Sequence, residues 1–230
     1  VSDLAVYDTQ TGRWYIRTLA GETLAWDLQF GGAGFTPVSG DFDGDGINDL
    51  CVYQEDTGLW YAYSLENEEI IFWGIQFGGP DFTPVSGDYD GDGVSDLVVY
   101  HSIGVETLRW FGYSVEIEDP IFWDVPWGLK GWAVVPGDYD GDGRSDLCVY
   151  DEANGAWYAV DSAGDEPILW NENWGGEGFI PVPGDYDGDG VSDLCVYHLD
   201  SGLWYAKTAD GELIFWAVQF GGPEFLPVAK

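Results

Sequence analysis

Four short segments of the chain carry carboxylates at a spacing that suits a divalent cation. In the segment from Asp41 to Asp49, aspartates occupy positions 1, 3, 5 and 9, and glycines occupy positions 4 and 6. Calcium takes about six to eight oxygen ligands in proteins, which carboxylates and backbone carbonyls supply. The two glycines permit the tight turns that would wrap the chain around one ion. Crowded carboxylates repel one another unless a cation binds, so four copies of the pattern predict metal sites.

We predict four calcium ions, each held by the four aspartates of one segment and by the backbone carbonyl at position 7. Magnesium demands a tighter octahedral shell and zinc prefers histidine or cysteine, so both suit these segments less well. The alternative is a solvent-facing Asp-Gly hairpin turn without a metal. The candidate ligands are Asp41, Asp43, Asp45, Ile47, Asp49, Asp88, Asp90, Asp92, Val94, Asp96, Asp138, Asp140, Asp142, Arg144, Asp146, Asp185, Asp187, Asp189, Val191 and Asp193.

These acidic loops belong to an internal repeat of about 47 residues. The aspartate at position 9 occurs five times, at Asp3, Asp49, Asp96, Asp146 and Asp193. One tryptophan row comprises Trp14, Trp60, Trp110, Trp157 and Trp204. A second row comprises Trp26, Trp73, Trp123, Trp170 and Trp216. An aromatic–glycine pair follows the second row in every unit, as at Phe30-Gly31. The chain therefore contains five units.

Each unit reads as four short strands. In one unit they are 82–85, 97–100, 108–113 and 121–125, which are rich in β-branched and aromatic residues and bounded by turn formers. No helical period of ten or more residues is visible. Four strands in a unit of this length are typical of a propeller blade. We predict an all-β, five-bladed β-propeller with four antiparallel strands per blade, forming a single domain over residues 1–230.

The two ends of the chain complement each other in the periodic frame. Val1-Ser2-Asp3 matches the end of an acidic loop, and the chain stops just before the start of another. We predict that strands near 225–228 and 4–7 pair, so that residues 1–39 and 225–230 close one blade that lacks its acidic loop. Asp3 alone is then expected to hold no metal. An open solenoid and a fragment of a larger ring are the alternatives, and the chain is expected to be a segment of something longer.

The repeated phrase D-x-D-G-D-G-x-x-D-L, followed by V-Y and later by the aromatic–glycine pair, resembles the FG-GAP/VCBS repeats of bacterial surface proteins and integrin α heads. The resemblance covers all five units and implies a propeller with calcium in its blade hairpins. Two features depart from the integrin pattern, because those propellers have seven blades and because one acidic loop is missing here. The loop also resembles the first nine positions of an EF-hand loop, but Val52 stands where an EF-hand has its glutamate.

The composition excludes several classes of partner. The chain of 230 residues has 42 Asp and Glu against 7 Lys and Arg, a net charge of −35. No basic stripe is available for nucleic acid or for an anionic membrane surface. Hydrophobic residues make up 45% of the chain and aromatic residues 17%. This composition argues against a disordered acidic tail. No apolar run is long enough to cross a membrane, so we expect no membrane insertion.

The cysteines, histidines and tryptophans have structural explanations. Cys51, Cys148 and Cys195 share one repeat position with alanine and valine, which predicts buried free thiols. His101 and His198 also share a position, and a place on the blade rim is expected. Both tryptophan rows fall where a blade needs a large apolar wedge, so most tryptophans are predicted in the core, and a minority near the loops is left as candidates for a groove between blades.

The sequence predicts a non-catalytic, calcium-stabilised module outside the cell or on its surface, where calcium keeps weak sites filled. Its ligand would be a glycan or a protein bound in repeated grooves, with avidity on a dense polymer. Gln29, Gln76 and Gln219, with Asn173 and Pro126 at the same repeat position, are candidate groove residues, although a hydrogen bond between blades is the favoured explanation for them. A polysaccharide lyase or hydrolase is the alternative, for which the insertion near Arg109 is the one asymmetric feature. A purely structural adhesin segment is the third possibility.

Overall fold

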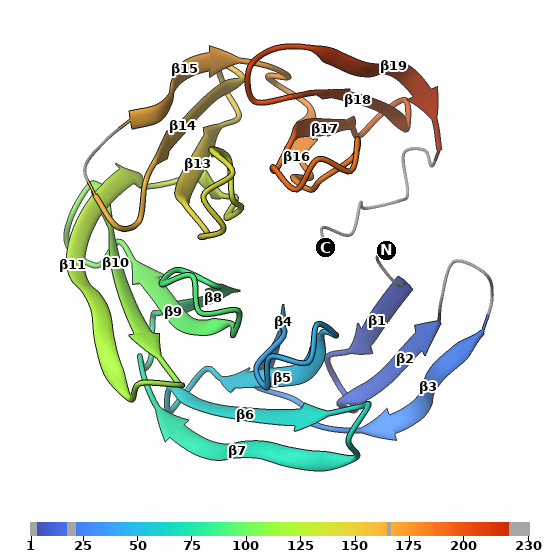
Figure 1. The fold of residues 1–230 in the computed structure, drawn as a ribbon, viewed down its shortest axis with the longest axis vertical. Coiled ribbons are helices and arrows are strands. Elements are labelled where there is room, and N and C mark those ends of the chain that lie inside the picture. Colours follow the sequence, from blue (N-terminus) through green and yellow to red (C-terminus); the bar gives the residue numbers. More distant parts are fainter. Residues whose placement is uncertain (1–3, 18–21, 165–166, 221–230) are drawn as a thin grey trace. The chain divides into compact units, whose positions relative to one another are not determined.

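The described part of the chain folds into five antiparallel β-sheets and contains no helix. The computed structural model describes residues 4–17, 22–164 and 167–220. Within them, the strands of every sheet lie side by side in chain order (Figure 1). This is the blade topology of a five-bladed β-propeller, so the predicted fold class is confirmed. No helix in the described part of the chain could span a membrane.

The strand boundaries follow the repeat. The first sheet contains β1 (Leu4–Asp8), β2 (Arg13–Arg17) and β3 (Thr23–Gln29). The second contains β4 (Phe35–Gly40), β5 (Asp49–Gln54), β6 (Leu59–Ser64) and β7 (Glu69–Gln76). The third contains β8 (Thr83–Gly87), β9 (Asp96–His101), β10 (Thr107–Ser114) and β11 (Asp119–Leu129). The fourth contains β12 (Ala133–Val134), β13 (Leu147–Asp151), β14 (Ala156–Val160) and β15 (Pro167–Asn173). The fifth contains β16 (Phe179–Pro181), β17 (Leu194–His198), β18 (Leu203–Lys207) and β19 (Leu213–Gln219).

The predicted closure of the first blade lies outside the described residues. Its first sheet has three described strands, whereas the other four sheets have four each. Asp3 and the strand expected at 225–228 fall in the ranges that are not described. The pairing of the two chain ends therefore stays a prediction.

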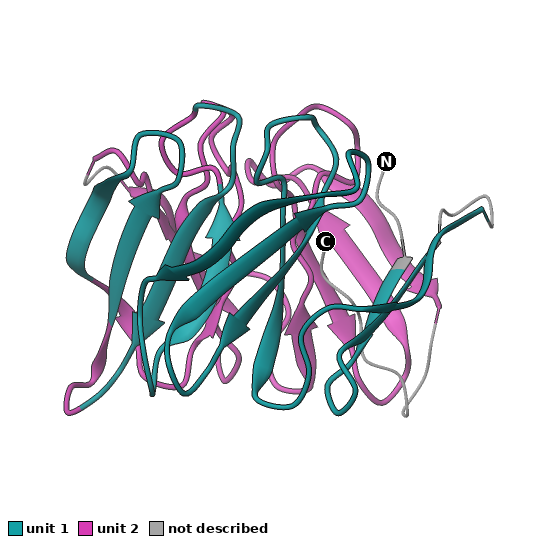
Figure 2. Cartoon of the chain, turned by 90° about the horizontal axis from the view of Figure 1, so that it is seen from below, with its two compact units in different colours: residues 1–87, 92–103, 109–125 teal, residues 88–91, 104–108, 126–230 magenta. Residues whose placement is uncertain are grey.

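The chain divides into two compact units, which Figure 2 shows in two colours. The first unit comprises residues 1–87, 92–103 and 109–125, and thus holds the first two sheets and most of the third. The second unit comprises residues 88–91, 104–108 and 126–230, and holds the last two sheets. The single-domain organisation stays a prediction.

In the four sheets that follow the first, the second strand is buried on both faces. In β5, residues from Asp49 to Tyr53 are all buried, and the corresponding run in β17 is buried as well. A strand covered on both sides has a continuous apolar sequence, which explains L-C-V-Y at this position. The third strand alternates instead, with every second residue buried in β6 and β10. The second strand is therefore the centre of the core in these four sheets, whereas Val6 on the equivalent strand β1 is 60% exposed.

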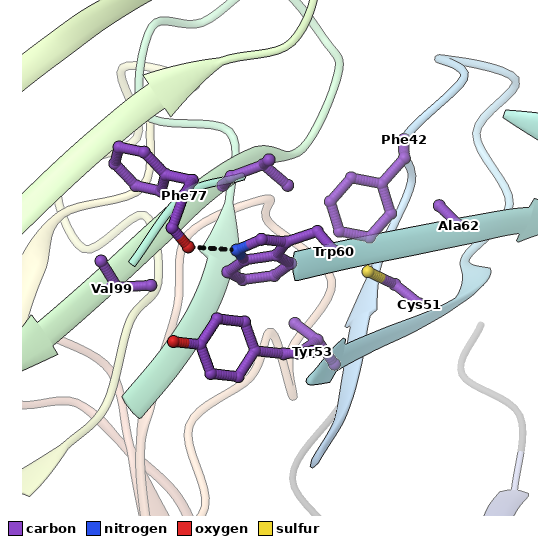
Figure 3. Packing of buried hydrophobic residues seen from close by; sticks show 9 residues of the cluster. Phe42, Cys51, Tyr53, Trp60, Ala62, Phe77 and Val99 are labelled. Atoms are coloured by element: carbon purple, nitrogen blue, oxygen red, sulfur yellow. Dashed lines mark hydrogen bonds between the residues drawn. The ribbon is translucent and has the colours of Figure 1, made fainter. Parts of the chain in front are cut away.

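The first tryptophan row fixes the end of each blade to its core. Trp60 is fully buried among Cys51, Tyr53 and Phe77, and its indole N–H donates to the Phe77 carbonyl at 2.8 Å (Figure 3). Equivalent bonds join Trp14 to Phe30, Trp157 to Trp174 and Trp204 to Phe220. A buried indole needs such an acceptor, and the carbonyl of the aromatic–glycine pair supplies it.

The glycine of that pair is required by a tyrosine of the second strand. The Tyr53 hydroxyl donates to the Gly79 carbonyl at 2.8 Å and accepts from the Gly79 amide at 2.9 Å. The backbone must pass close to this hydroxyl, and a Cβ on Gly78 would stand 2.8 Å from it. Gly78 also has a φ of 97°, where a side chain is strained. The repeated aromatic–glycine pair is thus a packing device.

The cysteines behave as predicted. Cys51, Cys148 and Cys195 are buried free thiols, each in the central strand of its blade. Burial raises the pKa of the Cys195 thiol to about 12 and raises that of Cys51 as well. They act as small apolar residues in the core.

The second tryptophan row contradicts the prediction that it is core. Its five members lie on the last strand of each sheet and are 64% to 71% exposed. Each follows a partly buried or buried residue and precedes an irregularity of the strand that turns the indole outward. Sequence equivalence correctly grouped these residues, but it did not show which face of the strand they occupy.

The different burial of the two rows predicts that the same substitution changes the free energy of unfolding by different amounts. Trp60→Phe removes the indole donor and leaves the buried Phe77 carbonyl without it, so the free energy of unfolding should fall by about 2 kcal/mol or more. Trp73→Phe, on the neighbouring strand, should change it by less than about 0.5 kcal/mol. Urea denaturation followed by circular dichroism measures both. Equal effects would contradict the assigned burial of the two rows.

Candidate metal centres

Each acidic loop connects the first and second strands of a blade and is wound by its own carboxylates. Asp41 accepts from the Gly44 amide through Oδ1 and from the Gly46 amide through Oδ2, both at 2.7 Å. The Asp45 amide donates to Asp43 Oδ1 at 3.2 Å, and the Ile47 amide donates to Asp45 Oδ1 at 2.8 Å. Asp138 and Asp185 accept the equivalent bonds in their own loops. The spacing of aspartate and glycine therefore dictates the coil of the loop.

The carboxylate at position 9 links the end of the loop to its beginning. Asp49 Oδ2 accepts from the Phe42 amide at 2.7 Å, and Asp146 Oδ2 accepts from the Tyr139 amide at 2.8 Å. The aromatic ring at position 2 is in the core in three loops, where Phe42 for example is 2% exposed and packs edge-on against Phe72, whereas Tyr186 in the fourth loop is 38% exposed. Position 2 thus anchors the loop while position 9 ties its ends together.

The winding gathers three carboxylates in each loop so that one oxygen of each lies within 4.8 Å of the others. In three loops the members come from positions 1, 3 and 9, and in the first loop they come from positions 1, 3 and 5. The clusters are Asp41, Asp43 and Asp45; Asp88, Asp90 and Asp96; Asp138, Asp140 and Asp146; and Asp185, Asp187 and Asp193. Four groups that could hold a cation are therefore present at the predicted places.

The remaining predicted ligands lie in the same loops but outside these clusters. They are Asp49 in the first loop and Asp92, Asp142 and Asp189 at position 5 of the others. Ile47, Val94, Arg144 and Val191 at position 7 each donate an amide hydrogen to the position-5 carboxylate. The binding of a metal by their backbone carbonyls stays a prediction.

Asn67 is a loop contact that the sequence did not reveal. Its amide donates to Asp43 Oδ2 at 3.1 Å and lies 3.4 Å from Asp45 Oδ2, although 24 and 22 residues separate them. These bonds draw Asp45 toward Asp43, which agrees with the different membership of the first cluster. Asn67 lies in the turn between β6 and β7, and no repeated residue marks it.

A buried carboxylate oxygen in the third loop has no hydrogen-bond partner and suits a bound cation. Asp146 is fully buried, and its Oδ1 has no hydrogen-bond partner. A buried carboxylate oxygen left unpaired carries a large desolvation cost, whereas a coordinated cation would satisfy it. Asp138 and Asp140 stand beside it. The donor set is entirely oxygen, which fits calcium better than a transition metal.

The same burial shifts the pKa of the position-9 carboxyls. Desolvation, with further repulsion from the neighbouring aspartates, raises the pKa of Asp146 to about 8. The same causes raise the pKa of Asp49 to about 7 and that of Asp193 to about 6. In the metal-free chain these groups therefore hold protons in a pH range where an ordinary aspartate is ionised.

Successive loops are linked to one another within each compact unit. The Ser95 amide donates to the Asp41 carbonyl at 2.5 Å, and the Asp41 amide donates to Ser95 Oγ at 3.0 Å. The Ser192 amide makes the same contact with the Asp138 carbonyl. A Cβ on Gly40 would stand 2.8 Å from Ser95 Oγ, so glycine before the loop permits this approach. Position 1 of one loop is thus fixed by position 8 of the next.

The other residues singled out by sequence have local structural roles. The His101 ring packs on Phe82 and Phe111, and His198 Nδ1 lies 2.8 Å from Ser201 Oγ. Gln76 Nε2 donates to the Thr57 carbonyl at 2.8 Å within its own blade. Gln29 and Gln219 make the equivalent bond. The hydrogen bond expected between blades therefore lies within one blade, where it joins the end of the last strand to the turn between the two strands before it.

The raised pKa values predict a pH dependence for the metal-free protein. Between about pH 4 and the raised folded-state values, the folded chain binds more protons than the unfolded chain. Its stability should therefore fall as the pH rises from 5 to 8 in EDTA, and the melting temperature should decrease by several degrees.

Scanning calorimetry in high salt, which screens surface repulsion, measures this trend. In calcium the trend should disappear or reverse, because cations compete with protons for the same carboxylates. Asp146→Asn should flatten the curve in EDTA. A melting temperature that rises with pH in EDTA would contradict the burial of these groups.

Comparison with known proteins leaves the family unassigned. No protein-family model and no curated protein sequence matches the chain. Solved structures that are similar to it include the V. cholerae biofilm matrix protein Bap1 (18% identity, TM-score 0.40) and TolB from Acinetobacter baumannii (13% identity, TM-score 0.47). The matches cover 93% and 92% of this chain, but only 35% and 49% of those proteins. The resemblance to FG-GAP/VCBS repeats stays a prediction from the repeated loop.

Proposed function

We propose that the chain is a non-catalytic recognition module, stabilised by calcium, that binds a repetitive ligand outside the cell. The observation that carries the proposal is the exposure of the second tryptophan row. An indole at the same place in every sheet, 64% to 71% exposed, forms a set of equivalent contact points. Equivalent weak contacts gain affinity together on a polymer that reaches several of them.

Calcium is the cation that the acidic loops suit best. They offer clustered carboxylates, an oxygen-only donor set and, at Asp146, a buried oxygen without a partner. Their coil is held by backbone amides and by packing of position 2, which favours a structural site. Such sites are filled where calcium is abundant, which supports an extracellular or cell-surface location. The loops also support a place among the FG-GAP/VCBS-type repeats.

Catalysis is the weaker alternative. An active site needs one asymmetric set of groups with matched acid and base. The histidines are engaged in packing or local hydrogen bonds, and the cysteines are buried core residues. The position-9 carboxyls have raised pKa values, but they recur from loop to loop. This repetition favours binding over the lyase or hydrolase alternative.

The first test concerns the metal. Isothermal titration should find four calcium ions per chain, and EDTA should lower the melting temperature by many degrees. A ligand at a hundred times its dissociation constant stabilises the folded state by about 2.7 kcal/mol per site. Asp146→Asn should reduce the stoichiometry to three, whereas Glu152→Gln, the same charge change on an exposed residue outside the loops, should leave it at four. Two or fewer ions in the unmodified protein would contradict the assignment.

The second test concerns recognition. The protein is passed over immobilised neutral polysaccharides, polyuronates and fibrous proteins in calcium and in EDTA. We expect retention on at least one polymer at concentrations where its monomeric unit is not bound, because avidity requires repetition. New chain ends released from a polymer would instead establish an enzyme. Retention by none of the polymers would leave the structural adhesin segment as the better explanation.

A further inference from the structure

The exposed tryptophans pack on an aromatic ring of the adjacent strand, and this contact recurs from blade to blade. Trp26 meets Tyr15 edge-on at 5.2 Å between ring centroids, and Trp170 meets Tyr158 at 5.7 Å. Trp123 packs in the same way on Phe111 at 5.0 Å. An edge-on contact fixes the plane of the indole while leaving most of its surface exposed. The rings are therefore held in place before any ligand arrives.

A β-bulge follows the tryptophan. Trp14 pairs with Leu28 and Tyr15 pairs with Trp26, so Asp27 is an extra residue on β3. The extra residue has a left-handed backbone, with φ of 65° at Asp27, 78° at Gly74, 59° at Asp124, 58° at Asn171 and 58° at Ala217. Such a backbone is unfavourable for most residues other than glycine, and aspartate and asparagine tolerate it better than the rest. Bulges re-aim side chains, and strained residues of this kind cluster at binding sites.

In two blades the bulge residue is an aspartate that pairs with an arginine beside the tryptophan. Asp27 Oδ2 lies 2.6 Å from Arg13 Nη1, and the Tyr15 hydroxyl donates to Asp27 Oδ1 at 3.1 Å. Asp124 binds Arg109 through both carboxylate oxygens, at 2.9 and 3.0 Å. About half of each aspartate side chain is exposed, so acceptor and donor groups face solvent together.

A third blade carries a neutral version of this arrangement. Asn171 follows Trp170, and the Tyr158 hydroxyl donates to Asn171 Oδ1 at 3.0 Å. Trp132 stacks on the other side of the same support, 4.9 Å from Tyr158 with the rings nearly parallel. The remaining two blades lack a polar side chain at the bulge, because Gly74 and Ala217 stand there. Three blades thus combine an exposed indole with a fixed polar group, and two do not.

We infer that Trp26 with Asp27 and Arg13, Trp123 with Asp124 and Arg109, and Trp170 with Asn171 are three subsites for the pyranose units of a neutral polysaccharide. This inference rests on the proposed recognition function and names its ligand and its contacts. The C–H face of a pyranose ring is apolar and flat, and it stacks on an exposed indole. Its neighbouring hydroxyls both donate and accept, which a paired carboxylate and guanidinium can satisfy side by side.

Charge favours a neutral ligand over an acidic one. The chain carries a net charge of −35, and the arginines of the first and third blades are neutralised by their aspartates. A polyanion would be repelled as it approached, whereas a neutral glycan would not. An apolar protein segment is the competing ligand, but it would gain nothing from a charged pair held next to each indole.

The blades without a polar bulge residue supply matched controls. Affinity electrophoresis in calcium compares the retardation of the protein by mixed-linkage β-glucan and galactomannan with that by polygalacturonate. The test variants are Trp123→Ala, Asp124→Ala and the triple variant Trp26→Ala/Trp123→Ala/Trp170→Ala. The controls are the double variant Trp73→Ala/Trp216→Ala and Ile70→Ala, which removes another exposed apolar side chain. Calorimetry verifies that each variant remains folded.

We expect a neutral polymer to retard the protein and the polyuronate to leave its mobility unchanged. Trp123→Ala and Asp124→Ala should each weaken retardation, and the triple variant should weaken it about tenfold or more. The double variant and Ile70→Ala should retain most of the binding. Equal losses in the double and triple variants would overturn the assignment of the three subsites. Retention of the protein on a fibrous protein or polyuronate, without binding to either neutral polymer, would overturn the ligand class while leaving the recognition function standing.

Discussion

The burial of the carboxylate at position 9 of each acidic loop is the constraint on which the rest of the structure depends. This aspartate begins or immediately precedes the central strand of its blade, so it lies at the junction between loop and core. Its tie to the amide of position 2 places an aromatic ring in the core beneath the loop. Its charge beside two or three others favours either protonation or a cation. The loop is therefore both joined to the core and equipped with a carboxylate cluster that could hold a metal ion.

This arrangement makes the fold and the predicted cation mutually dependent. The second strand is buried on both faces, so a disturbance at its first residue reaches the packing of Trp60 and its equivalents. The contacts between Ser95 and Asp41 and between Ser192 and Asp138 carry the effect from one loop to the next within a unit. Within each compact unit, these contacts support the outer strands that carry the exposed tryptophans. Binding by strands supported in this way costs little ordering of the protein.

The two tryptophan rows show how one residue type serves two purposes in the same repeat. In the first row, an indole such as that of Trp60 donates its N–H to a backbone carbonyl and is buried in the core. The second row stands on an edge-on aromatic ring, and its exposure is set by the bulge residue that follows. The surroundings of these exposed indoles differ from blade to blade, because aspartate, asparagine, glycine and alanine all occur at the bulge and because an arginine pairs with the aspartate in two blades.

The sequence by itself determined the periodic features of this protein. Five units, four strands per unit and four acidic loops follow from residue spacing, since a strand alternates faces and an Asp-Gly loop coils through its own carboxylates. The buried thiols followed from the exchange of cysteine with alanine and valine. The tertiary structure decided what spacing cannot encode. Burial depends on the neighbouring strands, and a bulge reverses the alternation, so only the fold shows that Trp73 faces solvent while Trp60 does not. The clustering of position 9 rather than position 5 in three loops, and the contact of Asn67 with Asp43, depend on elements that are distant in the chain or on the core beneath the loop.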